Sequence, residues 1–151
     1  MKKILIVMLV TIVTTASAFA NNNSPLNEKV LMSFNTTFST AVNVTWKELK
    51  DYGLYHASFT NGQQQLDAFF NEEGELITTA RTINQKQLPL AIAANISDRY
   101  GDMIMDADVL ECNNAGITTY YVTVRSAKNT IILKADGDNS LSVFKKQKNL
   151  I

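Results

Sequence analysis

Residues 54–70 read LYHASFTNGQQQLDAFF and predict a β-hairpin. Apolar and polar residues alternate in both halves of the stretch, as is typical of half-buried strands. Asn61-Gly62 lies between the halves and is a strong hairpin signal, because both residues tolerate the positive φ of a tight turn. The residues that the alternation places on one buried face are Tyr55, Ala57, Phe59, Leu66, Ala68 and Phe70.

A helix is expected before this hairpin. From Leu26 to Val42 an apolar residue recurs every four positions, which predicts an amphipathic helix over about 25–40, with Ser24-Pro25 at its start. Further strands are expected at 44–50 and 76–83. The first half of the chain therefore reads as one helix followed by four antiparallel strands.

The second half follows the same order. Pro89 is expected to open a helix that carries Ile92, Ile96 and Tyr100 on one face, and Gly101 to end it in the left-handed conformation. Turn residues then separate four stretches of strand character. These predicted strands are 103–111, 117–125, 130–135 and 141–146.

The matching order predicts an internal repeat. Phe34 corresponds to Ile96 at an offset of 62, and Tyr55 corresponds to Tyr120 at an offset of 65. We therefore predict an α+β fold made of two tandem repeats, each a helix followed by four antiparallel strands (α-β-β-β-β twice), with the helices packed on one sheet face. The repeats are expected at about 25–83 and 88–147, and chance similarity of two α/β segments is the alternative.

The opposite sheet face is the candidate binding surface. It is called the open face, meaning the side of the sheet away from the helices. Aromatic residues and arginine are enriched at protein interfaces, although a polar-rich sheet face can also be simply solvated. The residues proposed to bind a partner there are His56, Phe69, Arg81, Tyr121, Arg125 and Phe144.

The N-terminus predicts export. Lys2 and Lys3 precede an apolar run over 4–13, and small residues at Ala18 and Ala20 follow, as in a secretory signal peptide. Cleavage is expected after Ala20, which leaves residues 21–151 as a single domain, periplasmic or secreted, without stable membrane insertion. The chain has 14 basic and 14 acidic residues, and this balance argues against nucleic-acid binding.

Signals for catalysis or metal binding are weak. One His and one Cys do not make a structural zinc site. The stretch that begins at Asp136 resembles a calcium-binding loop, but it has Leu141 at the sixth position, where Gly is needed, and Gln147 at the twelfth, where Glu is needed. Cys112 and His56 are the only possible Cys–His pair, and nothing in the sequence brings them together. We expect the Cys112 side chain to be buried. We therefore expect no enzyme, no metal and no cofactor.

The chain resembles the PepSY-like family of exported bacterial proteins, related to β-lactamase-inhibitor-like domains. The resemblance rests on the order of Phe38, Asn43–Trp46, the strand 55–59, the acidic turn 71–76, Leu88-Pro89 and the strand 120–122. It implies tandem helix-plus-sheet units that bind proteins or peptidases. Asn139 stands where the family pattern has Gly, and the resemblance transfers no catalytic residue.

These observations lead to one expected function and three alternatives. We expect a non-catalytic exported binding module that engages or inhibits another envelope or secreted protein, of peptidase type, through the open face. The main alternative is a small-ligand or metal-ion binding protein of the periplasm. An enzyme that uses Cys112 and a structural component of a larger assembly are the others.

Overall fold

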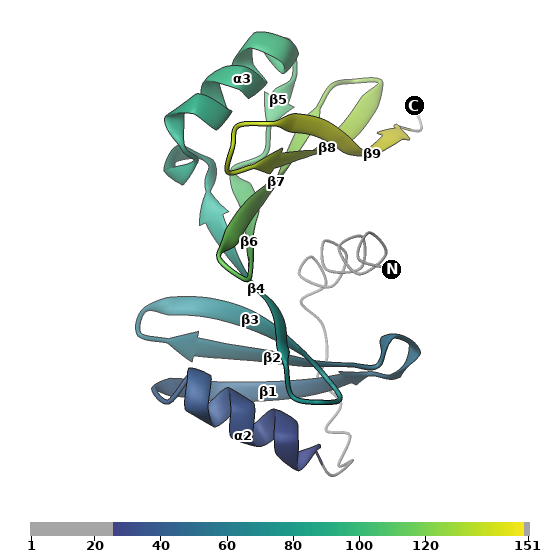
Figure 1. Ribbon diagram of the computed structural model, residues 1–151. Helices are drawn as coiled ribbons and strands as arrows, with labels where there is room; N and C mark the ends of the chain where they lie inside the picture. The colour runs from purple at the N-terminus through teal and green to yellow at the C-terminus, as the bar shows by residue number, and fades with distance from the viewer. Residues whose placement is uncertain (1–25, 150–151) are drawn as a thin grey trace. The chain divides into compact units, whose positions relative to one another are not determined.

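The computed structural model describes residues 26–149 and divides into two compact units within one strand, after Thr79. Each unit combines one helix with antiparallel strands, so the predicted α+β class is confirmed (Figure 1). The predicted signal peptide and its cleavage site lie outside the described residues. Among residues 26–149, no helix has the length and apolar character needed to cross a membrane.

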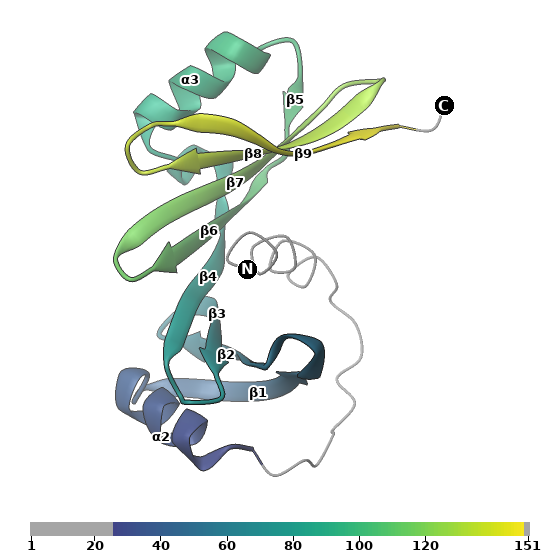
Figure 2. The same ribbon diagram turned by 45° about the vertical axis from the view of Figure 1, so that its right-hand side comes forward.

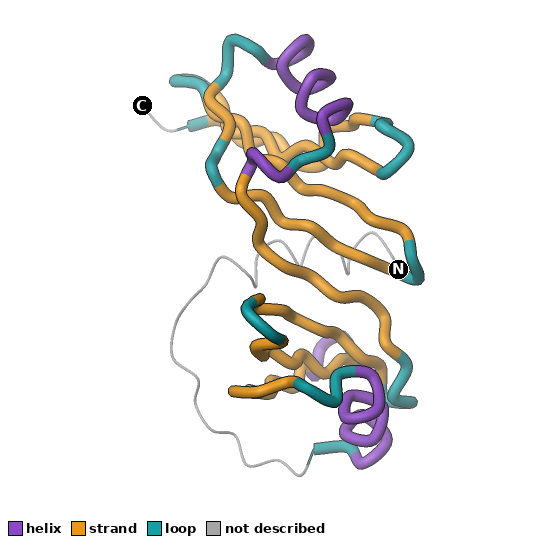
Figure 3. The backbone as a smooth tube through the Cα atoms, turned by 90° about the vertical axis from the view of Figure 1, so that its left-hand side faces the viewer, coloured by secondary structure: helices purple, strands orange, loops and turns teal. Residues whose placement is uncertain are grey.

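The bounds of the elements follow the predicted order, with β4 shared by both units (Figure 3). The first unit contains α2 (Glu28–Thr37), β1 (Ala41–Leu49), the 3-10 turn η1 (Lys50–Tyr52), β2 (Leu54–Asn61), β3 (Gln64–Asn71) and the start of β4 (Leu76–Asn84). The second contains η2 (Gln85–Gln87), α3 (Leu90–Tyr100), β5 (Ile104–Met105), β6 (Asp108–Asn114), β7 (Ile117–Arg125), β8 (Asn129–Asp136) and β9 (Leu141–Lys148).

Helix α2 begins three residues later than predicted, because Asn27 caps it. The Asn27 side-chain oxygen accepts a hydrogen bond from the backbone N–H of Lys29 at 2.9 Å, which satisfies one of the unpaired donors of the first turn. The Asn27 amide also donates to the Glu72 carbonyl at 2.8 Å. This second bond fixes the start of α2 to the turn between β3 and β4.

The first unit has the strand order β1-β2-β3-β4, and the predicted hairpin is confirmed. Asn61 pairs with Gln64, so the two-residue loop consists of Gly62 and Gln63, one position later than predicted. Gly62 has φ 64°, as expected of glycine at the first central position of a type II′ turn. Tyr55 therefore lies opposite Phe70, and the residues predicted for the buried face of β2 and β3 still share one face.

An aromatic cluster forms the core of the first unit, where α2 lies along one side of the strands (Figure 1). Phe34 projects from α2, and its ring centroid lies 5.0 Å from both Trp46 and Phe59. Trp46 of β1 also packs against this core. Edge-on ring pairs add about 0.5–1.5 kcal/mol each beyond burial of their area. The first unit is thus held together largely by rings from α2, β1, β2 and β3.

Helix α3 covers one side of the strands in the second unit (Figure 2). Ile92 and Ile96 are buried against Val122 and Leu133, as the four-residue spacing predicts. Gly101 ends the helix with φ −59°, so the predicted left-handed conformation is wrong. The glycine serves close approach instead, because a Cβ there would lie 2.6 Å from the Ser97 carbonyl oxygen.

The single strand predicted over 103–111 is also wrong, because two short strands occupy this stretch. In β5, Ile104 pairs with Arg125, whereas in β6 Leu110 pairs with Tyr121, so both strands use β7 as their partner. Asp106 lies in the gap and donates its backbone N–H to the Thr123 carbonyl at 2.9 Å. The second unit therefore has the order β4-β6-β7-β8-β9, with β5 beside β7.

Candidate functional site

Five of the six predicted binding residues lie on the open face of their own unit. In β2 and β3, the neighbours of His56 and Phe69 in sequence point into the first core, so these two residues point away from it. In β7, Tyr120, Val122 and Val124 belong to the second core, which places Tyr121 and Arg125 on the other side. Phe144 contacts Tyr121 and shares its face.

The sixth residue, Arg81, corrects the prediction. Arg81 is two residues before Ile83 in β4, so the two side chains point to the same face of the sheet. Because Ile83 is buried in the second core, Arg81 lies on the helix side of its strand. Its Nε donates to Glu111 at 2.6 Å, and Glu111 pairs with Tyr120 of the same face. This hydrogen bond raises the pKa of Arg81 and outweighs the opposing effect of burial. Ile83, which is buried, therefore shows which residues of β4 face the second core, whereas Leu76 is exposed.

The open face of the first unit carries a buried histidine. His56 Nε2 lies 2.6 Å from Asp67 Oδ1, and the His56 ring stacks on Phe69 with centroids 4.5 Å apart and planes 6° from parallel. His56 is 7% exposed and Phe69 is 1% exposed. A polar residue this buried needs a partner, and Asp67 supplies it.

On the open face of the second unit, a β-bulge brings two aromatic rings together. Leu133 pairs with Val143 and Ile132 pairs with Lys145, so Phe144 is the extra residue of β9. A bulge of this kind redirects the side chains that follow it. The Phe144 ring meets the Tyr121 ring edge-on at 5.1 Å, and Lys145 falls on the open face beside Ile132.

The cations of this face differ in their pairing. Arg125 donates from Nε and Nη2 to the Asp106 carboxylate at 2.8 Å, and this fork raises the pKa of Arg125. The Arg125 side chain is 54% exposed, so solvent weakens the pair. Lys145, by contrast, forms no ion pair with any residue of the described chain. Lys145 is therefore the cation of this face most available to a partner.

Asp136 joins three polar side chains at the other end of the same face. It accepts hydrogen bonds from Thr119 Oγ1 at 2.8 Å, from Lys134 Nζ at 2.6 Å and from Ser140 Oγ at 3.4 Å. Partial burial alone would raise the pKa of Asp136, but these hydrogen bonds and the Lys134 charge outweigh it and lower the pKa below the ordinary value. The charged carboxylate therefore stabilises the folded unit.

We predict that Asp136→Asn lowers the free energy of unfolding near pH 7, and that this loss shrinks in acid. A depressed native pKa contributes stability above the ordinary value of about 4 and loses it as the pH falls through the native pKa. Urea unfolding at several pH values measures the gap between variant and wild type. Asp102→Asn makes the same change of charge at an exposed position two residues after α3 and is the control. A pH-independent gap for Asp136→Asn would contradict the interpretation.

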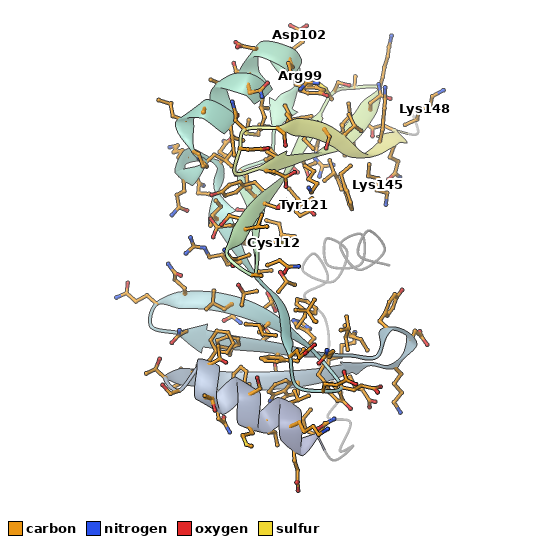
Figure 4. The ribbon with its side chains drawn as sticks, viewed as in Figure 1. Arg99, Asp102, Cys112, Tyr121, Lys145 and Lys148 are labelled. Atoms are coloured by element: carbon orange, nitrogen blue, oxygen red, sulfur yellow. The ribbon has the colours of Figure 1, made fainter. Side chains whose placement is uncertain are left out.

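The centres of both open faces are buried, which counts against the alternative of a simply solvated face. Tyr121 is 3% exposed, and burial raises its pKa. Cys112 lies diagonally across the strand pair from Tyr121 and is also buried, as predicted (Figure 4). Arg125 and Lys145 remain exposed at the margin. A partner that binds the open face of the second unit would therefore contact it at β9 rather than at β6.

Metal and Cys–His chemistry find little support in the geometry. The part of the chain that the structure describes contains no group of three His, Cys, Asp or Glu side chains placed to hold a metal ion. His56 Nε2 already contacts Asp67, and His56 and Cys112 belong to different units. The hypothesis of a thiol enzyme thus gains no observation in its favour.

The sequence did not identify Lys145 or Asp136 as part of this surface. Leu141, Val143 and Lys145 are spaced two residues apart, so in a regular strand all three would lie on the helix side. Only the bulge at Phe144 moves it to the open face. The sequence pattern predicts a turn at Asp136. The feature that could have indicated its role is its position directly after the predicted strand 130–135.

Comparison with known sequences identifies no relative, because no protein-family model matches the chain and no curated protein matches it either. The PepSY-like resemblance is therefore not confirmed by a family match.

Solved structures do share the fold. A BLIP-like protein from Bacteroides fragilis matches with a TM-score of 0.68 at 18% identity, covering 84% of this chain and 89% of its own. A DUF2874 family protein from Bacteroides ovatus matches with a TM-score of 0.69 at 16% identity, with coverages of 84% and 89%. A protein from Bacteroides eggerthii inferred to be periplasmic matches with a TM-score of 0.66 at 13% identity, with coverages of 80% and 87%. At these identities the likeness establishes a BLIP-like fold.

Proposed function

We propose that this chain is a non-catalytic binding module, exported to the periplasm or secreted, that engages or inhibits another envelope or secreted protein of peptidase type. The proposal rests on the exposed edge of the open face of the second unit, where Phe144, Arg125 and Lys145 lie. This edge is called the aromatic and cationic margin. There Phe144 is held against Tyr121, and Lys145 is exposed without an ion pair in the described chain.

The margin has the composition of an interface rather than of a core. Phe144 is half-buried, so its ring is fixed yet still reachable, which limits the entropy lost on binding. Arg125 is held in place by Asp106 and can add directed hydrogen bonds at the rim. Buried aromatic anchors with a polar rim are the usual source of binding energy. Tyr121 supports Phe144 from beneath and is proposed to act through it.

The fold supports the same proposal at a coarser level. The named likeness to a BLIP-like protein is consistent with a binding module, and the PepSY-like assignment is kept as part of the proposal. We further propose that the two units are tandem repeats of one ancestral unit. Val30 and Phe34 of α2 are buried at the same four-residue spacing as Ile92 and Ile96 of α3. Val30 precedes Ile92 by 62 residues, and Phe34 precedes Ile96 by the same number.

Affinity capture tests the proposal. The chain is purified from the periplasm of an expressing bacterium, which also reports on export, and is immobilised against envelope extract. We expect wild type to retain a specific protein and Phe144→Ala/Arg125→Ala to lose it by about tenfold or more, because truncated anchors at interface centres commonly cost over 1.4 kcal/mol. The same extract, assayed with a casein substrate, should lose peptidase activity when wild type is added.

The matched control is Leu90→Ala/Lys86→Ala. It also removes one apolar and one basic side chain from the second unit, both of them exposed and away from β9. Circular dichroism must show that both double variants are folded. Equal capture by wild type, control and the Phe144/Arg125 variant would exclude the open face as the binding surface.

A further inference from the structure

Strand β9 leaves one edge unpaired. Within residues 26–149, it is the last strand in the order of the second unit and has β8 as its only strand neighbour. At its start, the Leu141 carbonyl accepts a hydrogen bond from Arg99 at 3.1 Å, so α3 caps this end of the edge. From Ser142 to Lys148 the residues are exposed except Phe144, which is half-buried. The free edge therefore offers backbone N–H and C=O groups over most of the strand.

Lysines occupy both faces of this edge. Lys145 pairs with Ile132 on the open face, whereas Lys146 pairs with Ile131 on the helix side, and Lys148 follows Lys146 in phase (Figure 4). Lys128 lies in the adjoining turn, where its carbonyl accepts from the N–H of Asn149 at 2.9 Å. None of the four lysines forms an ion pair with a residue that the structure places.

The surrounding charge has the same sign. Residues 80–151 contain nine Lys and Arg against seven Asp and Glu, whereas residues 26–79 contain three against seven. The three Lys of β9 face no carboxylate partner in the described chain, although acidic residues are common elsewhere in it. The end of β9 is therefore a local concentration of uncompensated positive charge.

This charge selects among the chains that could pair with the edge. A second copy of β9 would bring lysines opposite lysines, which is destabilising, and edge lysines commonly prevent such self-pairing. An acidic strand would instead place a carboxylate opposite a lysine on each face, while its backbone completes the ladder. The other edge strand, β1, is less suited, because a bulge with Asn43 at φ 55° interrupts its register.

We propose that the free edge of β9 binds an acidic, extended segment of another protein, which adds as a further strand beside Lys145–Lys148. The site shares Lys145 with the aromatic margin of the open face but extends beyond that margin, because Lys146 and Lys148 lie on the opposite side of the sheet. Binding combines backbone hydrogen bonds with charge pairs on both faces, so salt weakens it and mutation of the lysines slows or abolishes it.

A labelled peptide tests the proposal directly. The probe is fluorescein-labelled Thr-Glu-Glu-Val-Glu-Glu-Thr, titrated with the full chain purified from the periplasm and followed by fluorescence anisotropy. We expect saturable binding, weaker at high salt, and a loss of about tenfold in affinity for Lys146→Glu/Lys148→Glu. The control Lys47→Glu/Lys86→Glu makes the same charge change at two exposed lysines that are not part of β9 and should bind as wild type does.

Two further probes separate a strand from simple charge attraction. The same peptide with alternate backbone amides N-methylated keeps every carboxylate but cannot complete a ladder, and it should fail to bind. Equal binding of the methylated peptide would overturn strand addition. The proposal is also overturned if the unmodified peptide fails to bind at about 1 mM, or if phosphatidylglycerol vesicles bind while the peptide does not. The Phe144→Ala/Arg125→Ala variant should still bind the peptide, which keeps this test independent of the proposed function.

Discussion

Phe34→Ala is expected to destabilise the first unit by about 3–5 kcal/mol, the usual cost of removing a buried phenylalanine ring. Phe34 is 3% exposed and lies within ring-contact distance of Phe38, Trp46, Phe59 and Phe70. Truncation therefore leaves a cavity lined by stiff rings that cannot collapse into it. Urea unfolding followed by Trp46 fluorescence measures the loss, because Trp46 is the only tryptophan and packs on Phe34.

Met32→Ala is the matched control for this variant. Met32 lies on the same helix but is 66% exposed, so its truncation should change the unfolding free energy by less than about 0.5 kcal/mol. The two units need not unfold together, and for this reason the Trp46 transition is analysed by itself. A shift of similar size for Phe34→Ala and Met32→Ala would show that the aromatic cluster is not the core of the first unit.

Strong local signals made most of the fold predictable. The hairpin around Gly62 combines strand alternation with a turn residue at the required position, and the buried pairs of α2 and α3 follow four-residue spacing. These features depend on neighbouring residues and on elementary steric rules. Element order and the buried faces of β2, β3 and β7 could therefore be derived from the sequence.

The errors occur where pairing with a distant strand overrides a local pattern. Residues 103–111 have strand character throughout, yet β7 pairs with them in two separate stretches, and the gap at Asp106 depends on Thr123 and Arg125. Arg81 was placed on the wrong face because Leu76 and Ile83 indicate opposite phases for β4. The ion pair with Glu111, thirty residues away, supports the phase of Ile83.

The candidate site was predictable in kind but not in detail. Alternation alone placed Tyr121 and Phe144 on the open face, and their contact needs only cross-strand neighbours. The bulge that adds Lys145 depends on how β8 and β9 pair, and no turn residue marks it. The burial of Phe69 and Tyr121 likewise could not be derived, because a polar-rich face reads as solvated until the structure shows how much of it is covered.

Gly74→Ala is the second substitution with a large expected effect, about 2–5 kcal/mol of destabilisation. Gly74 adopts φ 84° in the turn between β3 and β4, a conformation that costs a non-glycine residue about 1–2 kcal/mol. A Cβ at this position would also lie 2.7 Å from the Lys29 carbonyl oxygen and 2.9 Å from its carbon. Both atoms belong to the first turn of α2, so relief requires the helix to move, at an overpacking cost of about 1–3 kcal/mol.

Gly62→Ala separates these two contributions, since Gly62 has φ 64° in the same unit but would place its Cβ in open space. It should therefore lose only the conformational part, about 1–2 kcal/mol. Urea unfolding with Trp46 fluorescence compares both variants with wild type. A larger loss for Gly74→Ala would show that the β3–β4 turn presses against α2, as the hydrogen bond from Asn27 to the Glu72 carbonyl also indicates. Equal losses would mean that α2 shifts without cost, and that the β3–β4 turn does not press against it.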